Sequence, residues 1–130
     1  MNRILFISFL TLNLACFSQI PREINKDAYV EFNKADKKLN EVYQNILTEY
    51  KSDSIFIKKL KNTQRIWISF RDAQLEMKYP NYSKSYHSSS LLMCRAFYLK
   101  ELTVERTEKL KVWLNGIKEG DICSGSVKIN

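Results

Sequence analysis

The first long segment of the chain, residues 24–51, carries apolar side chains at steps of four and three residues. One stripe contains Ala28, Phe32, Ala35, Leu39, Val42 and Ile46, and Tyr43, Leu47 and Tyr50 widen it. This spacing places the apolar residues on one face of a helix and leaves polar residues on the other. The pattern therefore predicts an amphipathic helix that buries one face.

Two later segments repeat this helical period. Residues 52–79 place their apolar positions at Phe56, Leu60, Trp67, Phe70 and Met77, with Ile66 and Ile68 beside them. Ser52 or Asp53 can cap the start of this helix. A third helix runs from about Ser90, with its apolar positions at Leu92, Leu99, Leu102, Leu110 and Trp113. Gly116 stands where a helix commonly ends.

Composition strengthens this all-helical prediction. The 130 residues include only three glycines and two prolines, which disfavours a sheet protein with many turns. We therefore expect an all-α fold, a small bundle of about three long helices. The last segment, "GIKEGDICSGSVKIN", has turn signals at Gly120 and Gly125 and is expected to be an irregular tail.

The N-terminus has the layout of a secretory signal, with Arg3 followed by an apolar run and then small residues. Cleavage after Ser18 is favoured over lipid anchoring at Cys16, because Asn13 occupies a place where a lipidation motif requires an apolar residue. Residues 1–18 are thus predicted to be a signal peptide and residues 19–130 a single exported domain, periplasmic or secreted. We expect no transmembrane segment, and the sequence leaves the oligomeric state open.

Export changes the interpretation of the cysteines, because an oxidising compartment favours disulfides. Without Cys16, the pair Cys94 and Cys123 remains, and a bridge between them would fasten the tail to the third helix. Such a bridge closes a loop of about 30 residues and is worth about 3 to 4 kcal/mol in a chain-entropy model. The alternative, a metal site that includes His87, matches no zinc spacing, so we expect no metal.

Polar residues crowd beside the apolar stripe in the segment "NTQRIWISFRDAQ". Gln64, Trp67 and Arg71 share one helical face, while Arg65 and Asp72 lie on a neighbouring one. Asp36, Asn40 and Tyr43 align in the same way on the first helix, and Thr103 and Arg106 on the third. Because a buried arginine needs a partner, we expect Asp36 to meet Arg71 or Arg106, and Asn40 to meet Gln64. A polar layer that sets helix register is favoured over a ligand-binding or partner-binding surface.

The sequence gives no support for catalysis or for a cofactor. It contains one histidine, no glycine-rich phosphate loop and no nucleophile elbow. A sequence pI of 9.3 is compatible with nucleic-acid binding, but the secretion signal argues against it. We therefore expect a non-enzymatic protein that binds a protein partner or another envelope component.

Three segments together resemble the LprI-type lysozyme inhibitor family, a group of small exported bacterial helical domains. They read "ADKKLNEVYQNIL", "LKNTQRIWISFRDAQ" and "LTVERTEKLKVWL", and the resemblance covers about Ala28 to Leu114. The matching motif positions are Asp36, Leu39, Asn40, Tyr43, Gln64, Trp67, Arg71, Asp72, Thr103, Arg106 and Leu110. Many members have a cysteine where this chain has Leu75, so the pair Cys94 and Cys123 is interpreted as a replacement. The resemblance implies binding and inhibition of lysozyme at the cell envelope.

Charge suggests where a lysozyme could bind. Removal of Arg3 with the leader lowers the net charge from +7 to +6, and animal-type lysozymes are themselves basic. Residues 23–53 carry seven acidic and five basic residues, whereas residues 54–130 carry seven and fourteen. The first helix, through Glu31 or Glu41, is one candidate face, unless these carboxylates only form a solvated surface. The loop at residues 80–90 is the other candidate, through Tyr82, Tyr86 and His87, unless it only connects two helices.

Overall fold

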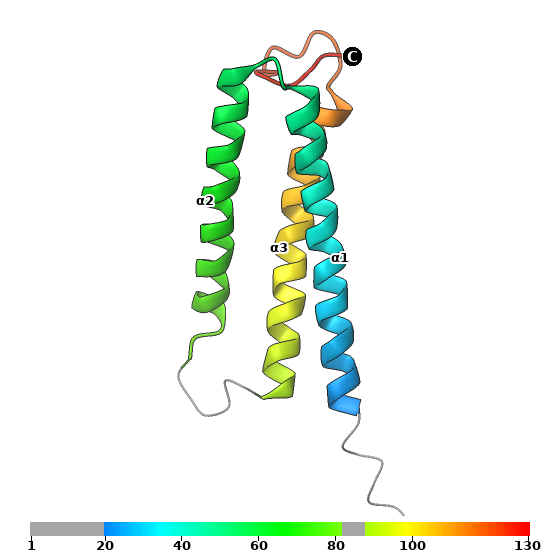
Figure 1. The fold of residues 1–130 in the computed structure, drawn as a ribbon, viewed down its shortest axis with the longest axis vertical. Coiled ribbons are helices and arrows are strands. Elements are labelled where there is room, and N and C mark those ends of the chain that lie inside the picture. The colour runs from blue at the N-terminus through cyan, green and yellow to red at the C-terminus, as the bar shows by residue number, and fades with distance from the viewer. Residues whose placement is uncertain (1–19, 82–87) are drawn as a thin grey trace, which may run out of the picture.

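The computed structural model describes residues 20–81 and 88–130, which form three helices and a C-terminal tail (Figure 1). The helices are α1, Ile20–Glu49, α2, Ser54–Lys78, and α3, Ser89–Asn115. The described part of the chain contains no named strand, so the prediction of an all-α fold with three long helices is confirmed. The predicted leader, including Cys16 and the cleavage position at Ser18, lies outside the described residues.

Helices α1 and α3 lie side by side along most of their length, and α2 stands further off (Figure 1). The central core joins all three helices through Leu39, Val42, Ile46, Leu60 and Leu110. The predicted stripe of α1 is confirmed, because Ala28, Ala35, Leu39, Val42 and Ile46 are buried. The small side chains of Ala28 and Ala35 let the backbone of α3 approach closely.

The predicted apolar stripe of α2 is only partly correct. Leu60 is buried and Trp67 is half-buried, but Phe70 is 56% exposed and Met77 is 76% exposed. Ile66 and Ile68 are exposed as well. Because α1 and α3 pair closely with each other, α2 meets them through one narrow face. Its neighbouring apolar face is left facing solvent.

Both predicted helix ends are confirmed. The Asp53 side chain accepts a 2.9 Å hydrogen bond from the Phe56 backbone N–H, which caps the first turn of α2. Gly116 ends α3 with a φ of 73°, a backbone conformation that favours glycine. A Cβ at this position would also meet the side chain of Asn130, which would have to move.

The tail is held back against the ends of α1 and α3 by hydrogen bonds and one ion pair. Tyr50 donates from its hydroxyl to the Trp113 carbonyl at 3.0 Å and accepts from the Lys128 backbone N–H at 3.2 Å. The Lys128 ammonium lies 2.6 Å from a Glu49 carboxylate oxygen, and the Trp113 indole N–H donates to Ser126 at 3.0 Å. A short parallel bridge joins Ile117 to Ile129.

The predicted Cys94–Cys123 disulfide is wrong in this structure, where both cysteines are free thiols. Cys94 lies in the second turn of α3, and Cys123 lies in the tail beyond the far end of the same helix. The 21 residues from Cys94 to Asn115 span about 32 Å of helix, whereas a disulfide joins Cα atoms less than about 7 Å apart. The tail is therefore fastened, as expected, but by polar contacts at the other end of the bundle.

Candidate functional site

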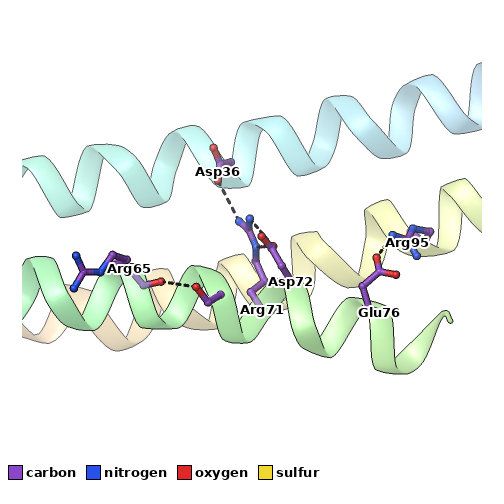
Figure 2. Close-up of polar contacts among 7 residues, drawn as sticks. Asp36, Arg65, Arg71, Asp72, Glu76 and Arg95 are labelled. Atoms are coloured by element: carbon purple, nitrogen blue, oxygen red, sulfur yellow. Dashed lines mark hydrogen bonds and ion pairs between the residues drawn. The ribbon is translucent and has the colours of Figure 1, made fainter. Parts of the chain in front are cut away.

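Arg71 joins α2 to α1 in the middle of the bundle. Its guanidinium lies 3.7 Å from a carboxylate oxygen of Asp36 and 2.9 Å from one of Asp72, as Figure 2 shows. The Arg71 side chain is only 14% exposed, whereas the side chains of Asp36 and Asp72 are 41% and 57% exposed. The predicted pairing of Arg71 with Asp36 is confirmed. The arginine charge is thus compensated by two carboxylates that remain partly hydrated.

Arg106 reaches from α3 to α2 and has a different environment. Its Nε donates a 3.1 Å hydrogen bond to the side-chain oxygen of the buried Gln64. Its Nη2 is buried and has no hydrogen-bond partner among the described residues. Burial lowers the pKa of the Arg106 guanidinium, which nevertheless stays charged in ordinary conditions. Arg106 is therefore a half-buried cation whose partner is a neutral amide.

Trp67 lies between these two arginines. The guanidinium carbon of Arg71 is 5.3 Å from the Trp67 ring centroid, and that of Arg106 is 5.8 Å away. Arg71 is also 5.9 Å from the Phe32 ring of α1. Cations at these distances are attracted to the faces of aromatic rings. The three helices therefore meet in one layer in which aromatic rings and arginines alternate.

The remaining motif positions divide between the core and this layer. Leu39 and Leu110 belong to the core, and Tyr43 packs against it. Asn40 is exposed and donates to Asp36 at 3.2 Å, so the predicted pairing of Asn40 with Gln64 is wrong. Asn40 is instead bonded within its own helix, while Gln64 accepts from Arg106 of α3. Thr103 is fully buried, and its hydroxyl has no hydrogen-bond partner in the described part of the chain.

A groove of about 270 Å³ opens between α2 and α3 beside the arginine layer. Trp67, Phe70 and Leu102 supply apolar lining, and the polar part of the wall consists of Arg71, Gln74, Glu105, Arg106 and Lys109. The groove exists because α2 stands off from the closely paired α1 and α3. The apolar spacing of α2 did not predict this groove, because it placed Phe70 among the buried residues.

A second polar cluster, which sequence reasoning missed, ties the end of α2 to the start of α3. Arg95 donates to Glu76 at 2.6 Å and to the Tyr79 carbonyl at 3.0 Å, and the Glu76 contact is visible in Figure 2. The Tyr98 hydroxyl donates to the Gln74 side chain at 2.9 Å, and the Lys78 ammonium lies 3.7 Å from the Tyr98 ring centroid. The spacing of Arg95 and Tyr98, one turn apart on α3, was the available signal.

The two predicted partner-binding surfaces have different outcomes. Tyr82, Tyr86 and His87 lie outside the described residues. Glu31 is bound by Lys34 at 2.7 Å and by Lys100 at 3.2 Å, and hydrogen bonds and charge from these lysines lower the pKa of its carboxyl. Glu41 is 3.4 Å from Lys38. Both acidic candidates on α1 therefore already face lysines of the same chain.

The described residues contain no group of three or more histidine, cysteine or acidic side chains arranged to hold a metal ion. Among the helices that the structure describes, none is sufficiently long and apolar for a membrane crossing.

The sequence was compared with models of known protein families. The family model described as "Lysozyme inhibitor LprI" matches residues 18–110, well over half of the chain. The chain belongs to the LprI lysozyme inhibitor family. The match covers α1, α2 and α3 as far as Leu110, and it contains all eleven predicted motif positions. No curated protein and no solved structure matches the chain.

The residues of the arginine layer lie within the range that the LprI model matches. Asp36, Gln64, Trp67, Arg71 and Arg106 all fall inside the matched range, whereas the tail from Gly116 onward falls outside it. The range begins earlier and ends slightly earlier than the resemblance at 28–114 that the motifs indicated. Leu75, where many members have a cysteine, is buried between the helices, so an apolar contact occupies that position here.

Proposed function

We propose that this protein is an exported, non-catalytic inhibitor of lysozyme. The observation that carries the proposal is the LprI family match over residues 18–110, which spans the layer where the three helices meet. The predicted leader supports it, because lysozyme acts on the cell envelope and an inhibitor must be exported to meet it. Cleavage near Ser18 would release the protein into the periplasm or the medium without a lipid anchor at Cys16.

Inhibition by a bundle of this kind is steric, because the protein only has to occupy the cleft where the enzyme binds its polysaccharide. The loop between α2 and α3 is our candidate for the inserted part, through Tyr82, Tyr86 and His87. Tyrosine rings supply flat amphipathic contact area, and serine and histidine side chains in this loop can replace the hydrogen bonds of sugar hydroxyls. The acidic face of α1 is the weaker candidate, because lysines of the same chain partly cancel the charges of Glu31 and Glu41.

The test is inhibition of peptidoglycan lysis by the purified protein, assayed against several types of lysozyme. Replacement of Tyr82, Tyr86 and His87 together by alanine is expected to raise the inhibition constant at least about tenfold, a loss of about 1.4 kcal/mol. Helical circular dichroism should be unchanged, because the substituted residues lie outside the helices. The matched variant Glu31→Gln/Glu41→Gln should inhibit like the natural protein.

Two results would redirect this proposal. Full inhibition by the triple alanine variant, with loss of inhibition in the glutamine variant, would move the binding face to α1. Absence of inhibition for every lysozyme tested would remove the proposed activity altogether.

A second candidate function rests on charge. The exported chain is predicted to carry a net charge of +6, and residues 54–130 alone carry fourteen basic and seven acidic residues. Such a surface attracts anionic envelope polymers without a specific site. Capture of lysozyme or of an anionic polymer at two salt concentrations separates the two functions, because nonspecific attraction between exposed charges is screened at high salt. A lysozyme complex that persists at high salt favours specific inhibition.

A further inference from the structure

The groove between α2 and α3 offers cationic groups beside apolar surface. Trp67 and Phe70 from α2 and Leu102 from α3 contribute the apolar surface, and Phe70 is 56% exposed. Arg106 and Lys109 line the same groove one turn apart on α3. A pocket that combines aromatic walls with a few charged groups is typical of a recognition site.

The two arginines of the groove differ in what balances their charge. Arg71 faces Asp36 and Asp72, so its charge has counter-ions within the chain. No carboxylate of the described residues lies within ion-pair distance of Arg106, whose side-chain hydrogen bond goes to the neutral amide of Gln64. Lys109 likewise has no hydrogen bond or ion pair within the described ranges, while Lys111 on the same helix is bound to Glu108 at 2.6 Å. The positive charges of Arg106 and Lys109 are therefore not balanced by a carboxylate within the described part of the chain.

One acidic residue lines the same groove. Glu105 is exposed, lies one turn before Lys109 on α3, and forms no ion pair with a described residue. Its charge offsets one of the two uncompensated cations, so the lining keeps a positive excess. An entering anion would gain from Arg106 and Lys109 and lose a smaller amount from Glu105.

The size of the groove limits its occupant. About 270 Å³ is below the usual range for a pocket that encloses a whole small-molecule ligand, and it suits one or two amino-acid side chains. We propose that this groove binds an acidic peptide segment of a partner protein, in which a carboxylate side chain faces Arg106 and Lys109 and an adjacent aromatic side chain packs on Trp67 and Phe70. None of the lining residues belongs to the segment 80–90, and the proposal does not depend on lysozyme inhibition.

A peptide titration followed by NMR tests the proposal directly. The probe is acetyl-Phe-Glu-amide, and the neutral control is acetyl-Phe-Gln-amide. The indole N–H signal of Trp67 reports on the groove, and that of Trp113, which donates to Ser126 at the far end of α3, is an internal control. We expect the Trp67 signal to shift with a dissociation constant on the order of 1 mM, and the neutral peptide to bind at least about tenfold more weakly.

Variants of exposed residues keep the test independent of folding. Lys109→Gln should weaken binding of the acidic peptide at least about threefold, and Glu105→Gln should strengthen it, because each changes the charge that the carboxylate meets. Lys111→Gln is the matched control, since it removes the same charge from the same helix outside the groove. Arg106→Gln should abolish binding, with circular dichroism used to check its fold.

The proposal is overturned by any of three results. Equal binding of the acidic and neutral peptides would show that no cation of the groove recognises a carboxylate. Equal losses in Lys109→Gln and Lys111→Gln would show only general charge attraction. A Trp67 signal that stays in place at about 20 mM acidic peptide, some twentyfold above the expected dissociation constant, would show that the groove does not bind.

Discussion

Arg106 on α3 and Gln64 on α2 are joined by a 3.1 Å hydrogen bond from the guanidinium Nε to the amide oxygen. Gln64 is 7% exposed, so this bond is made largely away from water. It is one of few side-chain contacts that hold α2 against α3 near the middle of the bundle. The contact explains why an amide stands where the apolar spacing of α2 would accept a leucine.

Gln64→Ala is expected to lower the free energy of unfolding by about 1.5 to 3 kcal/mol, because it leaves a charged donor of Arg106 unpaired and partly buried. Urea denaturation measures the loss. Gln44→Ala on the exposed face of α1 is the matched control and should change stability by less than about 0.5 kcal/mol. Equal effects of the two substitutions would contradict the structural role of the Gln64 contact.

Arg71→Ala is expected to lower the free energy of unfolding by about 1 to 2 kcal/mol. The free energy of lysozyme inhibition or of peptide binding should change by less than this. The expected loss lies between that of an exposed ion pair and that of a fully buried one, because Asp36 and Asp72 remain partly hydrated. Thermal and urea melting give the stability change. Arg65→Ala is the control, since Arg65 is exposed and its side chain donates only to Asn62 within the same helix. An unchanged melting temperature for Arg71→Ala would contradict the prediction.

Cys94 and Cys123 are expected to react with a thiol reagent as two free thiols in the folded protein without reductant. Cys123 is exposed and Cys94 is half-buried, so Cys123 should react first with a thiol reagent. The double variant Cys94→Ser/Cys123→Ser should keep the melting temperature of the natural protein within a few degrees. A mass increase of two hydrogens on reduction, with no free thiol beforehand, would instead demonstrate an intramolecular bridge.

Tyr50→Phe is expected to loosen the tail, because the Tyr50 hydroxyl both donates to Trp113 and accepts from the Lys128 backbone. Loss of these two hydrogen bonds should cost about 1 to 3 kcal/mol of local stability. Faster hydrogen exchange at the Lys128 amide and faster proteolysis near residues 118–128 are the measurements. Tyr29→Phe, at an exposed tyrosine of α1, should leave both rates unchanged.

Glu31 should give the protein a pH-dependent contribution to stability. Lys34 and Lys100 lower the pKa of Glu31 below its ordinary value of 4.5, so the ionised carboxylate stabilises the folded state above that pH. This contribution is lost as pH falls through the lowered pKa. The pKa of Lys34 is raised above 10.5 mainly by its hydrogen bond to Glu31, so the same contact is also lost at strongly alkaline pH.

The measurement compares the natural protein with Glu31→Gln across the pH range. We expect their stability difference to be present between about pH 5 and pH 10 and to vanish in more acidic solution. High salt should reduce the difference, because both lysine contacts are at the surface. A difference that is the same at pH 3 and pH 7 would show that the substitution acts through packing and not through charge.

Local patterns in the sequence determined the helices and their ends. The apolar steps of four and three in residues 24–51 correctly predicted which side of α1 is buried, since helical period and face are set within a few turns of one segment. Asp53 and Gly116 were recognisable as helix ends for the same reason, because capping depends on neighbouring backbone groups. The cost of a buried charge predicted that Asp36 meets Arg71 or Arg106, and the structure shows Arg71.

Only the tertiary structure decided how the helices are rotated and how far apart they lie. The close pairing of α1 with α3 exposes Phe70 and Met77, which have the same local spacing as buried residues. The packing of α2 against α3 brings Arg106 to Gln64, and the docking of the tail at the end of α3 keeps Cys123 far from Cys94. These relationships depend on the register and rotation of packed helices. Packing in turn depends on all the side chains at an interface together, and no single segment contains that information.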